Sequence, residues 1–148
     1  MSMSEVITLM AAVVAVVGSI ISLFISTKLA KHKERRQLLW TKELERFFSL
    51  EEQAGELVEF AGGYRPLPDD RSRLATELDS LADSAGRFAR YPEVRQAIRD
   101  LHNKVGRALE TKQSGNSYME ARAELGPAYQ KLLSACDEVL QRERAANA

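Results

Sequence analysis

The stretch VITLMAAVVAVVGSIISLFIST, residues 6–27, contains no charged side chain. As an α-helix rising about 1.5 Å per residue, it extends about 33 Å, the thickness of the hydrocarbon core of a bilayer. Its Val, Ile, Leu and Phe residues contribute about −4 to −7 kcal/mol on the membrane-insertion scale. The stretch therefore predicts a transmembrane helix.

The flanks of this stretch differ in charge. A secretory signal needs a basic leader and a shorter apolar core, whereas the leader MSMSE carries one acid and no Lys or Arg. A basic collar follows the stretch instead, formed by Lys28, Lys31, Lys33, Arg35 and Arg36. The positive-inside rule then predicts a single-pass protein of the inner (plasma) membrane with its N-terminus outside. Anionic lipid headgroups are the expected partners of the collar.

The residues after the collar have the composition and periodicity of helices. We divide the chain into residues 1–26 (outside tail and transmembrane helix), 27–36 (collar) and 37–148 (cytoplasmic helical bundle). Apolar residues continue at helical spacings up to GGYRPLP, which predicts that the membrane helix runs unbroken to about residue 61. They are Trp40, Leu44, Phe47, Ala54, Leu57, Val58 and Ala61, and Trp40 is expected in the core of the bundle.

Three further amphipathic segments complete the expected bundle. Their apolar stripes are Leu74, Leu78, Leu81, Ala85 and Phe88 in the first, Val94, Ile98, Leu101, Val105 and Ala108 in the second, and Leu125, Ala128, Leu132, Ala135, Cys136 and Val139 in the third. Pro and two acids open a second helix, Pro92 starts a third or kinks the second, and KQSGNS ends it. Ser117 and Glu120 predict a capping box for the last helix, Gly126 and Pro127 a bend or restart in it, and the tail RERAANA should fray. The fold class is all-α: an N-terminal transmembrane helix continuous with a long helix of a cytoplasmic four-helix bundle.

Small residues recur along one side of the transmembrane stretch. Thr8, Ala11, Ala15, Gly18 and Ser22 follow one another at spacings of three and four, and Ser19 and Ser26 add hydroxyl groups to the same side. Small residues let helix backbones approach closely in lipid, so this face predicts homo-oligomers. If several copies form a ring, the same face could line a pore. The alternative is a lone anchor in which these residues are incidental.

A second pattern is RFARYPEVRQAIRDLH, residues 87–102, in which Arg95, Arg99 and His102 share one helical face. Such a face can hold a phosphate or an RNA backbone, and the alternative is a solvated, partly salt-bridged surface. Arg95 and His102 also resemble the Arg-spacer-His signature of HEPN domains, helical bundles that often cut RNA as dimers. That resemblance implies a ribonuclease with Arg95 and His102 as catalytic residues.

Other chemistry finds little support in the sequence. Glu51, Glu52, Glu56 and Glu59 indicate a solvated helix face, and no Cys/His spacing indicates zinc. The lone Cys136 agrees with a reducing compartment and is expected as a small buried residue. No cofactor, metal or nucleic acid is expected.

The span, collar and small helical bundle together resemble single-span, HEPN-like membrane effectors of bacterial antiphage and CRISPR-associated defence. That resemblance implies a pore-forming or membrane-perturbing effector. Our first hypothesis is therefore a non-enzymatic membrane protein that homo-oligomerises through its span and its bundle. The alternatives are a membrane-tethered adaptor that binds another protein and a HEPN-like ribonuclease.

Overall fold

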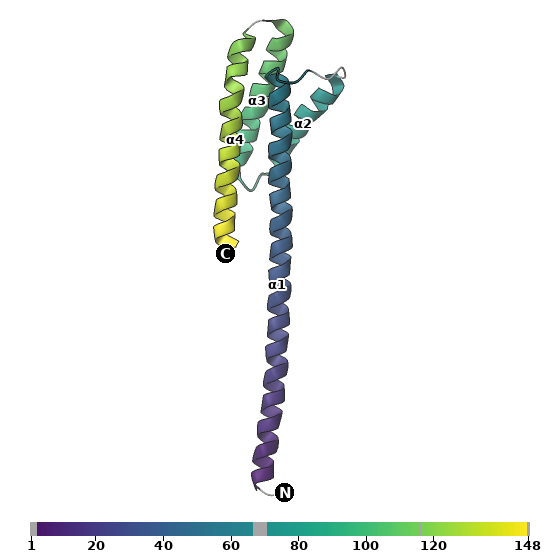
Figure 1. Cartoon of the computed structure of the whole chain (residues 1–148), viewed down its shortest axis with the longest axis vertical. Helices are drawn as coiled ribbons and strands as arrows, with labels where there is room; N and C mark the ends of the chain where they lie inside the picture. Colours follow the sequence, from purple (N-terminus) through teal and green to yellow (C-terminus); the bar gives the residue numbers. More distant parts are fainter. Residues whose placement is uncertain (1–2, 67–70, 116, 148) are drawn as a thin grey trace. The chain divides into compact units, whose positions relative to one another are not determined.

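The computed structural model describes residues 3–66, 71–115 and 117–147. Within these ranges the chain has four helices and no strand: α1 (Met3–Ala61), α2 (Arg71–Arg87), α3 (Pro92–Ser114) and α4 (Tyr118–Asn147) (Figure 1). The all-α prediction is confirmed, and so is the continuity of the apolar helix with the first bundle helix. The chain divides into two compact units, Met1–Lys42 and Glu43–Ala148, and α1 runs through the boundary.

The second unit has a single hydrophobic core. Its α1 residues recur at spacings of three and four, the repeat of an amphipathic helix: Phe47, Leu50, Ala54, Leu57 and Ala61. Every predicted apolar position of α3 is buried, and α2 and α4 contribute four residues each from the predicted stripes. These are Leu74, Leu81, Ala85 and Phe88 for the α2 stripe and Leu125, Leu132, Cys136 and Val139 for α4.

An aromatic cluster joins α1 to the connection between α2 and α3. The Phe47 ring meets the Phe88 ring edge-on at a centroid distance of 5.0 Å, and the Tyr91 ring lies 5.6 Å away. Aromatic pairs of this geometry contribute about 0.5–1.5 kcal/mol beyond the area they bury. The cluster therefore holds the bundle part of α1 against the start of α3.

Glycines end two of the helices at the predicted places. Gly63 has a φ of 78°, and the amide N–H of Tyr64 donates to the carbonyl of Glu59 at 3.0 Å, which is a Schellman cap on α1. Gly115 has a φ of 74° and its N–H donates to the Thr111 carbonyl at 2.8 Å. Both positions need the left-handed backbone that glycine adopts without strain.

Several local predictions are wrong. Trp40 is half-buried and lies in the first unit, whereas the core begins at Phe47, because helical spacing identifies a face but not how far other helices cover it. Ser117 has a φ of 57°, whereas the N-cap residue of a capping box has an extended backbone. Finally, α4 continues through Pro127 without restarting and includes the tail up to Asn147.

Candidate functional site

The apolar part of α1 is uncovered. All residues from Met3 to Leu39 are exposed, including large side chains such as Ile7 at 65%, Val14 at 70% and Leu23 at 73%. By length and composition α1 can cross a membrane, so it is a candidate membrane span. A core helix of a soluble protein would pass the same test, but its apolar surface would be buried. An uncovered apolar surface of this extent marks an interaction with lipid or protein.

The predicted small-residue face forms a groove along this part of α1. Its lining includes Ala15, Gly18, Ser19, Ser22 and Ser26, together with Leu23 and Thr27. A Cβ added at Gly18 would meet no atom within 4 Å, so a second helix has room to approach there. Thr8 and Ala11 belong to the same helix but not to the lining of the groove.

Several hydroxyl groups of the candidate span bond within their own helix. Ser19 donates to the Ala15 carbonyl at 2.9 Å, and Ser26 donates to the Ser22 carbonyl at 2.6 Å. Thr8 makes the same bond to the Ser4 carbonyl at 2.8 Å. Their donors are therefore satisfied in hydrocarbon without a partner helix. Association along this face would rest on close backbone packing, and the Ser19 and Ser26 hydroxyl groups need no bond to another chain.

The five cations of the collar, Lys28, Lys31, Lys33, Arg35 and Arg36, are all exposed. At 3.6 residues per turn they cover about 200° of the helix circumference. The Lys28 Nζ lies 5.3 Å from the centroid of the Phe24 ring, at the junction between apolar and basic sequence. Cations that directly follow an apolar helix suit the layer of anionic headgroups at a membrane surface.

The predicted Arg95, Arg99 and His102 face lies on α3. Arg95 and His102 are half-buried and Arg99 is exposed, and no ion pair between described residues involves the two arginines. The Arg95 Nε is buried and has no hydrogen-bond partner among the described residues. The structure thus keeps the three side chains on one helix and brings no acid to the arginines.

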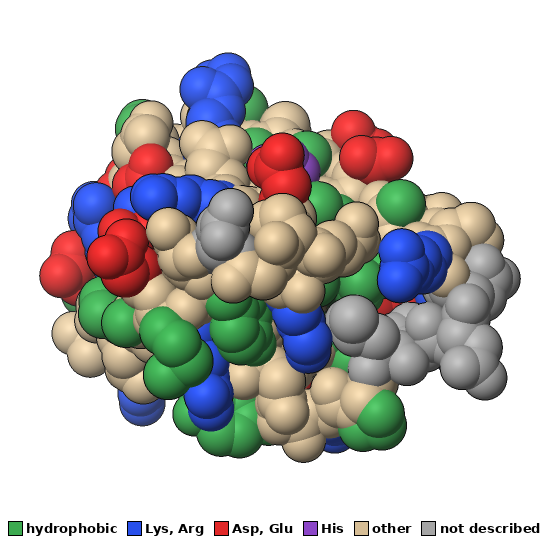
Figure 2. Space-filling view, turned by 90° about the horizontal axis from the view of Figure 1, so that it is seen from above, with side chains coloured by type: hydrophobic (Ala, Val, Ile, Leu, Met, Phe, Trp, Pro, Cys, Tyr) green, Lys and Arg blue, Asp and Glu red, His purple; other side chains and the backbone are tan. Residues whose placement is uncertain are grey.

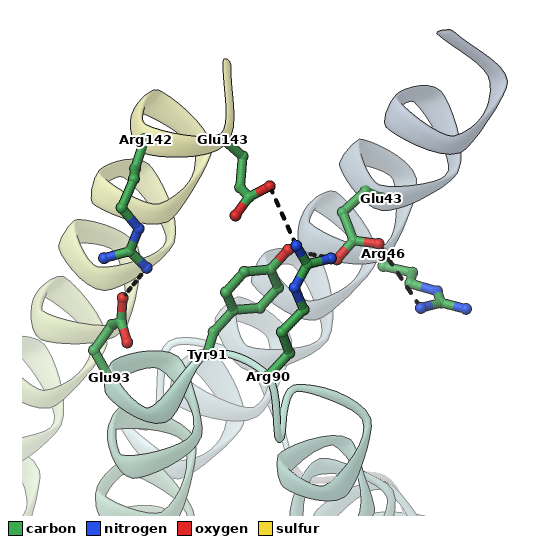
Figure 3. A network of polar contacts seen from close by, with 7 residues as sticks. All are labelled: Glu43, Arg46, Arg90, Tyr91, Glu93, Arg142 and Glu143. Carbon is green, nitrogen blue, oxygen red and sulfur yellow. Dashed lines mark hydrogen bonds and ion pairs between the residues drawn. The ribbon is translucent and has the colours of Figure 1, made fainter. Parts of the chain in front are cut away.

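A polar network that the sequence analysis missed joins α1, α3 and α4 (Figure 3). The Tyr91 hydroxyl donates to the Glu43 carboxylate at 3.1 Å, and the Arg90 guanidinium lies 3.8 Å from the Glu143 carboxylate. Burial and the bond to Glu43 raise the pKa of Tyr91 to about 12, so the phenol stays protonated and donates. The only signal in the sequence was a tyrosine directly before the proline that starts α3.

An ion pair completes this network on its α4 side. Arg142 pairs with Glu93, in the first turn of α3. The backbone N–H of Glu93 and the Arg142 guanidinium together hold the pKa of the Glu93 carboxyl below its usual value. The network anchors three helices to one another at the end of the bundle where its first residue, Glu43, lies. We read it as structural because every charge in it has a partner.

Cys136 shows no sign of reactivity. Its side chain is fully buried, and burial together with the charges of Glu51 and Asp137 raises the pKa of the thiol to about 12. The thiol is therefore neutral, which confirms the prediction of a small buried residue. Among the described residues no group of three metal-ligating side chains comes together.

At the other end of the bundle, α1 and α4 enclose a cleft. It is lined by Val58 of α1, by Gly62 and Tyr64 just after it, and by five residues of α4: Met119, Arg122, Ala123, Leu125 and Gly126. Sequence reasoning missed it because its two walls lie more than fifty residues apart in the chain.

No protein-family model, no curated protein and no solved structure matches this chain.

Proposed function

We propose that this chain is a non-enzymatic, single-pass membrane protein that self-associates through its span and presents its helical bundle to the cytoplasm. The observation that carries the proposal is the uncovered apolar surface of α1 from Met3 to Ile25. The second unit, by contrast, buries its apolar residues in one core. Its core residues therefore need no lipid or partner protein to remove them from water. Lipid is the environment that removes the most apolar surface of such a helix from water.

The orientation is supported by the collar. The segment directly after the span contains five cations, whereas the residues before the span contain no Lys or Arg. The five are Lys28, Lys31, Lys33, Arg35 and Arg36. Short flanks of this kind set the direction of insertion. We therefore place the bundle in the cytoplasm, beneath the inner membrane and next to its anionic headgroups.

Self-association is supported by the groove at Ala15 and Gly18. Two helices can bring their backbones close along such a face, which is where packing forces between helices in lipid are strongest. Assembly into a ring with a pore, and a role in defence against phage, remain predictions that rest on the resemblance stated above. The membrane-tethered adaptor and the HEPN-like ribonuclease remain alternative predictions from the sequence.

The test compares two substitutions in the full-length protein in a mild maltoside detergent. Gly18→Leu and Val13→Phe add the same number of side-chain carbons, but Val13 lies on the opposite side of the helix. Native mass spectrometry or light scattering should show a discrete oligomer for the natural chain and for Val13→Phe. Gly18→Leu should shift the particle toward the monomer.

Two outcomes contradict the proposal. A natural chain that is monomeric in every mild detergent rules out self-association. A chain that alkaline carbonate extracts completely from membranes rules out the span, and the collar would then need another explanation.

A further inference from the structure

The cleft at the end of the bundle has a volume of about 410 Å³. It lies between the last residues of α1 and the first part of α4, close to the connections that Figure 2 views end-on. Its lining is apolar or small apart from one arginine: Val58, Gly62, Tyr64, Met119, Arg122, Ala123, Leu125 and Gly126. The volume falls within the range of small-molecule sites, about 300–1,000 Å³.

Local contacts hold the walls of the cleft in place. The Schellman cap at Gly63 turns the chain so that the Tyr64 ring lies directly over Gly62, where an added Cβ would stand 3.0 Å from the ring. The Tyr118 hydroxyl donates to the Ala61 carbonyl at 2.8 Å and ties the start of α4 to the end of α1. The cleft is thus positioned by backbone geometry and by a hydrogen bond between its two walls.

Gly126 lines the cleft from α4 and is exposed. A Cβ built at this residue would meet no atom within 4 Å, although Gly126 lies inside α4. Glycine inside a helix is less favourable than alanine, and a larger side chain here would favour the helix and fill the hollow. A larger side chain at Gly126 is therefore expected to occupy part of the cleft without a steric clash.

Two exposed apolar side chains gather at this site. In the described part of the second unit, the exposed large hydrophobic residues are Phe48, Tyr64 and Met119. Tyr64, at 74% exposure, and Met119, at 69%, both line the cleft. An apolar group bound there would remove surface of both side chains from water.

The charge at the cleft is positive. The Arg122 guanidinium lies 5.0 Å from the centroid of the Tyr64 ring, and no ion pair between described residues involves it. Among the described residues that line the cleft none is acidic. The Lys112 Nζ lies nearby, 5.8 Å from the ring of Tyr118. A planar guanidinium stacked on an aromatic ring is held ready for a carboxylate.

We propose that this cleft binds a small amphiphilic carboxylate, with its apolar or aromatic body between Tyr64, Met119 and Gly126 and its acid group on Arg122. A multiply charged phosphate ester fits less well, because the lining offers one cation and an otherwise apolar surface. The site is independent of the proposed membrane function, since all its residues belong to the second unit.

The test uses two probes of nearly equal shape, 1-naphthaleneacetate and its neutral amide. Each is titrated into the full-length protein in maltoside micelles by isothermal calorimetry, and empty micelles give the blank. The carboxylate should bind saturably and about tenfold or more tightly than the amide, because hydrogen bonds to charged groups are the stronger ones.

Three variants sharpen the test. Gly126→Leu should abolish binding of both probes and leave the melting temperature unchanged or raised. Arg122→Gln should weaken the carboxylate about tenfold or more and leave the amide unchanged. Arg99→Gln, an exposed arginine of α3, is the matched control and should change neither.

The proposal is overturned if neither probe binds saturably, or if both bind Gly126→Leu as well as the natural chain. Equal losses for carboxylate and amide in Arg122→Gln overturn the assignment of the acid group to Arg122. In that case the guanidinium would act only by holding the Tyr64 ring.

Discussion

Two parts of the same helix, residues 6–27 and residues 47–61 of α1, have opposite relations to their surroundings. The first is apolar on every side and exposed throughout. The second is apolar at one face, where Phe47, Leu50, Ala54, Leu57 and Ala61 are buried in the core. The backbone is helical in both. The difference shows that a periodic apolar face lets a helix pack against its own chain. A helix that is apolar on all sides must instead be covered by lipid or by other protein.

The largest expected effect is the loss of bundle stability on a substitution in the packed part of α1. Phe47→Ala removes a fully buried ring that contacts Phe88 and Tyr91, so the bundle should lose about 3–5 kcal/mol of unfolding free energy. The matched change Phe24→Ala lies in the exposed span and should leave bundle stability unchanged. Urea unfolding in micelles, followed by circular dichroism, measures both. Equal losses would mean that the span packs against the bundle.

The next effect concerns the polar network that holds the packed part. Tyr91→Phe removes the hydroxyl that donates to Glu43 at 3.1 Å, and the bundle should lose about 1 kcal/mol. Tyr64→Phe, at an exposed tyrosine, should cost nothing measurable in the same unfolding experiment. A Tyr91→Phe protein as stable as the natural chain would show that water replaces the phenol.

A smaller effect is a dependence of bundle stability on pH. Arg142 and Lys104 help to hold the pKa values of Glu93 and Glu124 below 4.5. Because each pKa is lower in the folded state, the stabilisation is present above the unfolded-state value and is lost as the pH falls through the folded-state value. The melting temperature should therefore fall on acidification below about pH 5.

The double variant Glu93→Gln, Glu124→Gln isolates these two carboxylates. It should have a shallower decline of melting temperature between neutral and acidic pH than the natural chain. Both groups are partly exposed to solvent, so the difference should also shrink at high salt. An unchanged decline would assign the acid sensitivity to other carboxylates.

The smallest expected effect is that of removing a hydroxyl group from the span. Ser19→Ala should leave the oligomer unchanged, because the Ser19 hydroxyl donates to the Ala15 carbonyl of its own helix. Gly18→Leu, which adds bulk in the same groove, is the contrasting variant. If Ser19→Ala dissociates the oligomer in light scattering, then hydroxyl bonds between chains hold it together.

Much of the bundle could be read from spacing alone. The stripes of α2, α3 and α4 and the end of α1 at the GG pair are found where the sequence predicts them. Leu50, Ala97 and Ala121 were not assigned to the core, and Trp40 was assigned to it wrongly. These misses share a cause: a helical repeat gives the direction of a side chain but not the identity or reach of the helix opposite.

The candidate sites divide in the same way. The span, its small-residue face and the collar are contiguous in sequence, so helix geometry alone places their residues together. The Tyr91 network and the cleft join residues 48 or more positions apart. Residues such as Tyr64 and Arg122 carry no shared motif, and only packing brings them to one place.

The sequence by itself determined the helices, the two helix ends at Gly63 and Gly115 and the apolar stretch that is a candidate membrane span. These depend on local spacing, glycine backbone freedom and side-chain hydropathy. Only the tertiary structure decided which polar groups meet: Tyr91 with Glu43, Arg142 with Glu93, and Arg122 with the Tyr64 ring. Such contacts depend on how helices pack, and packing is set by the whole core at once.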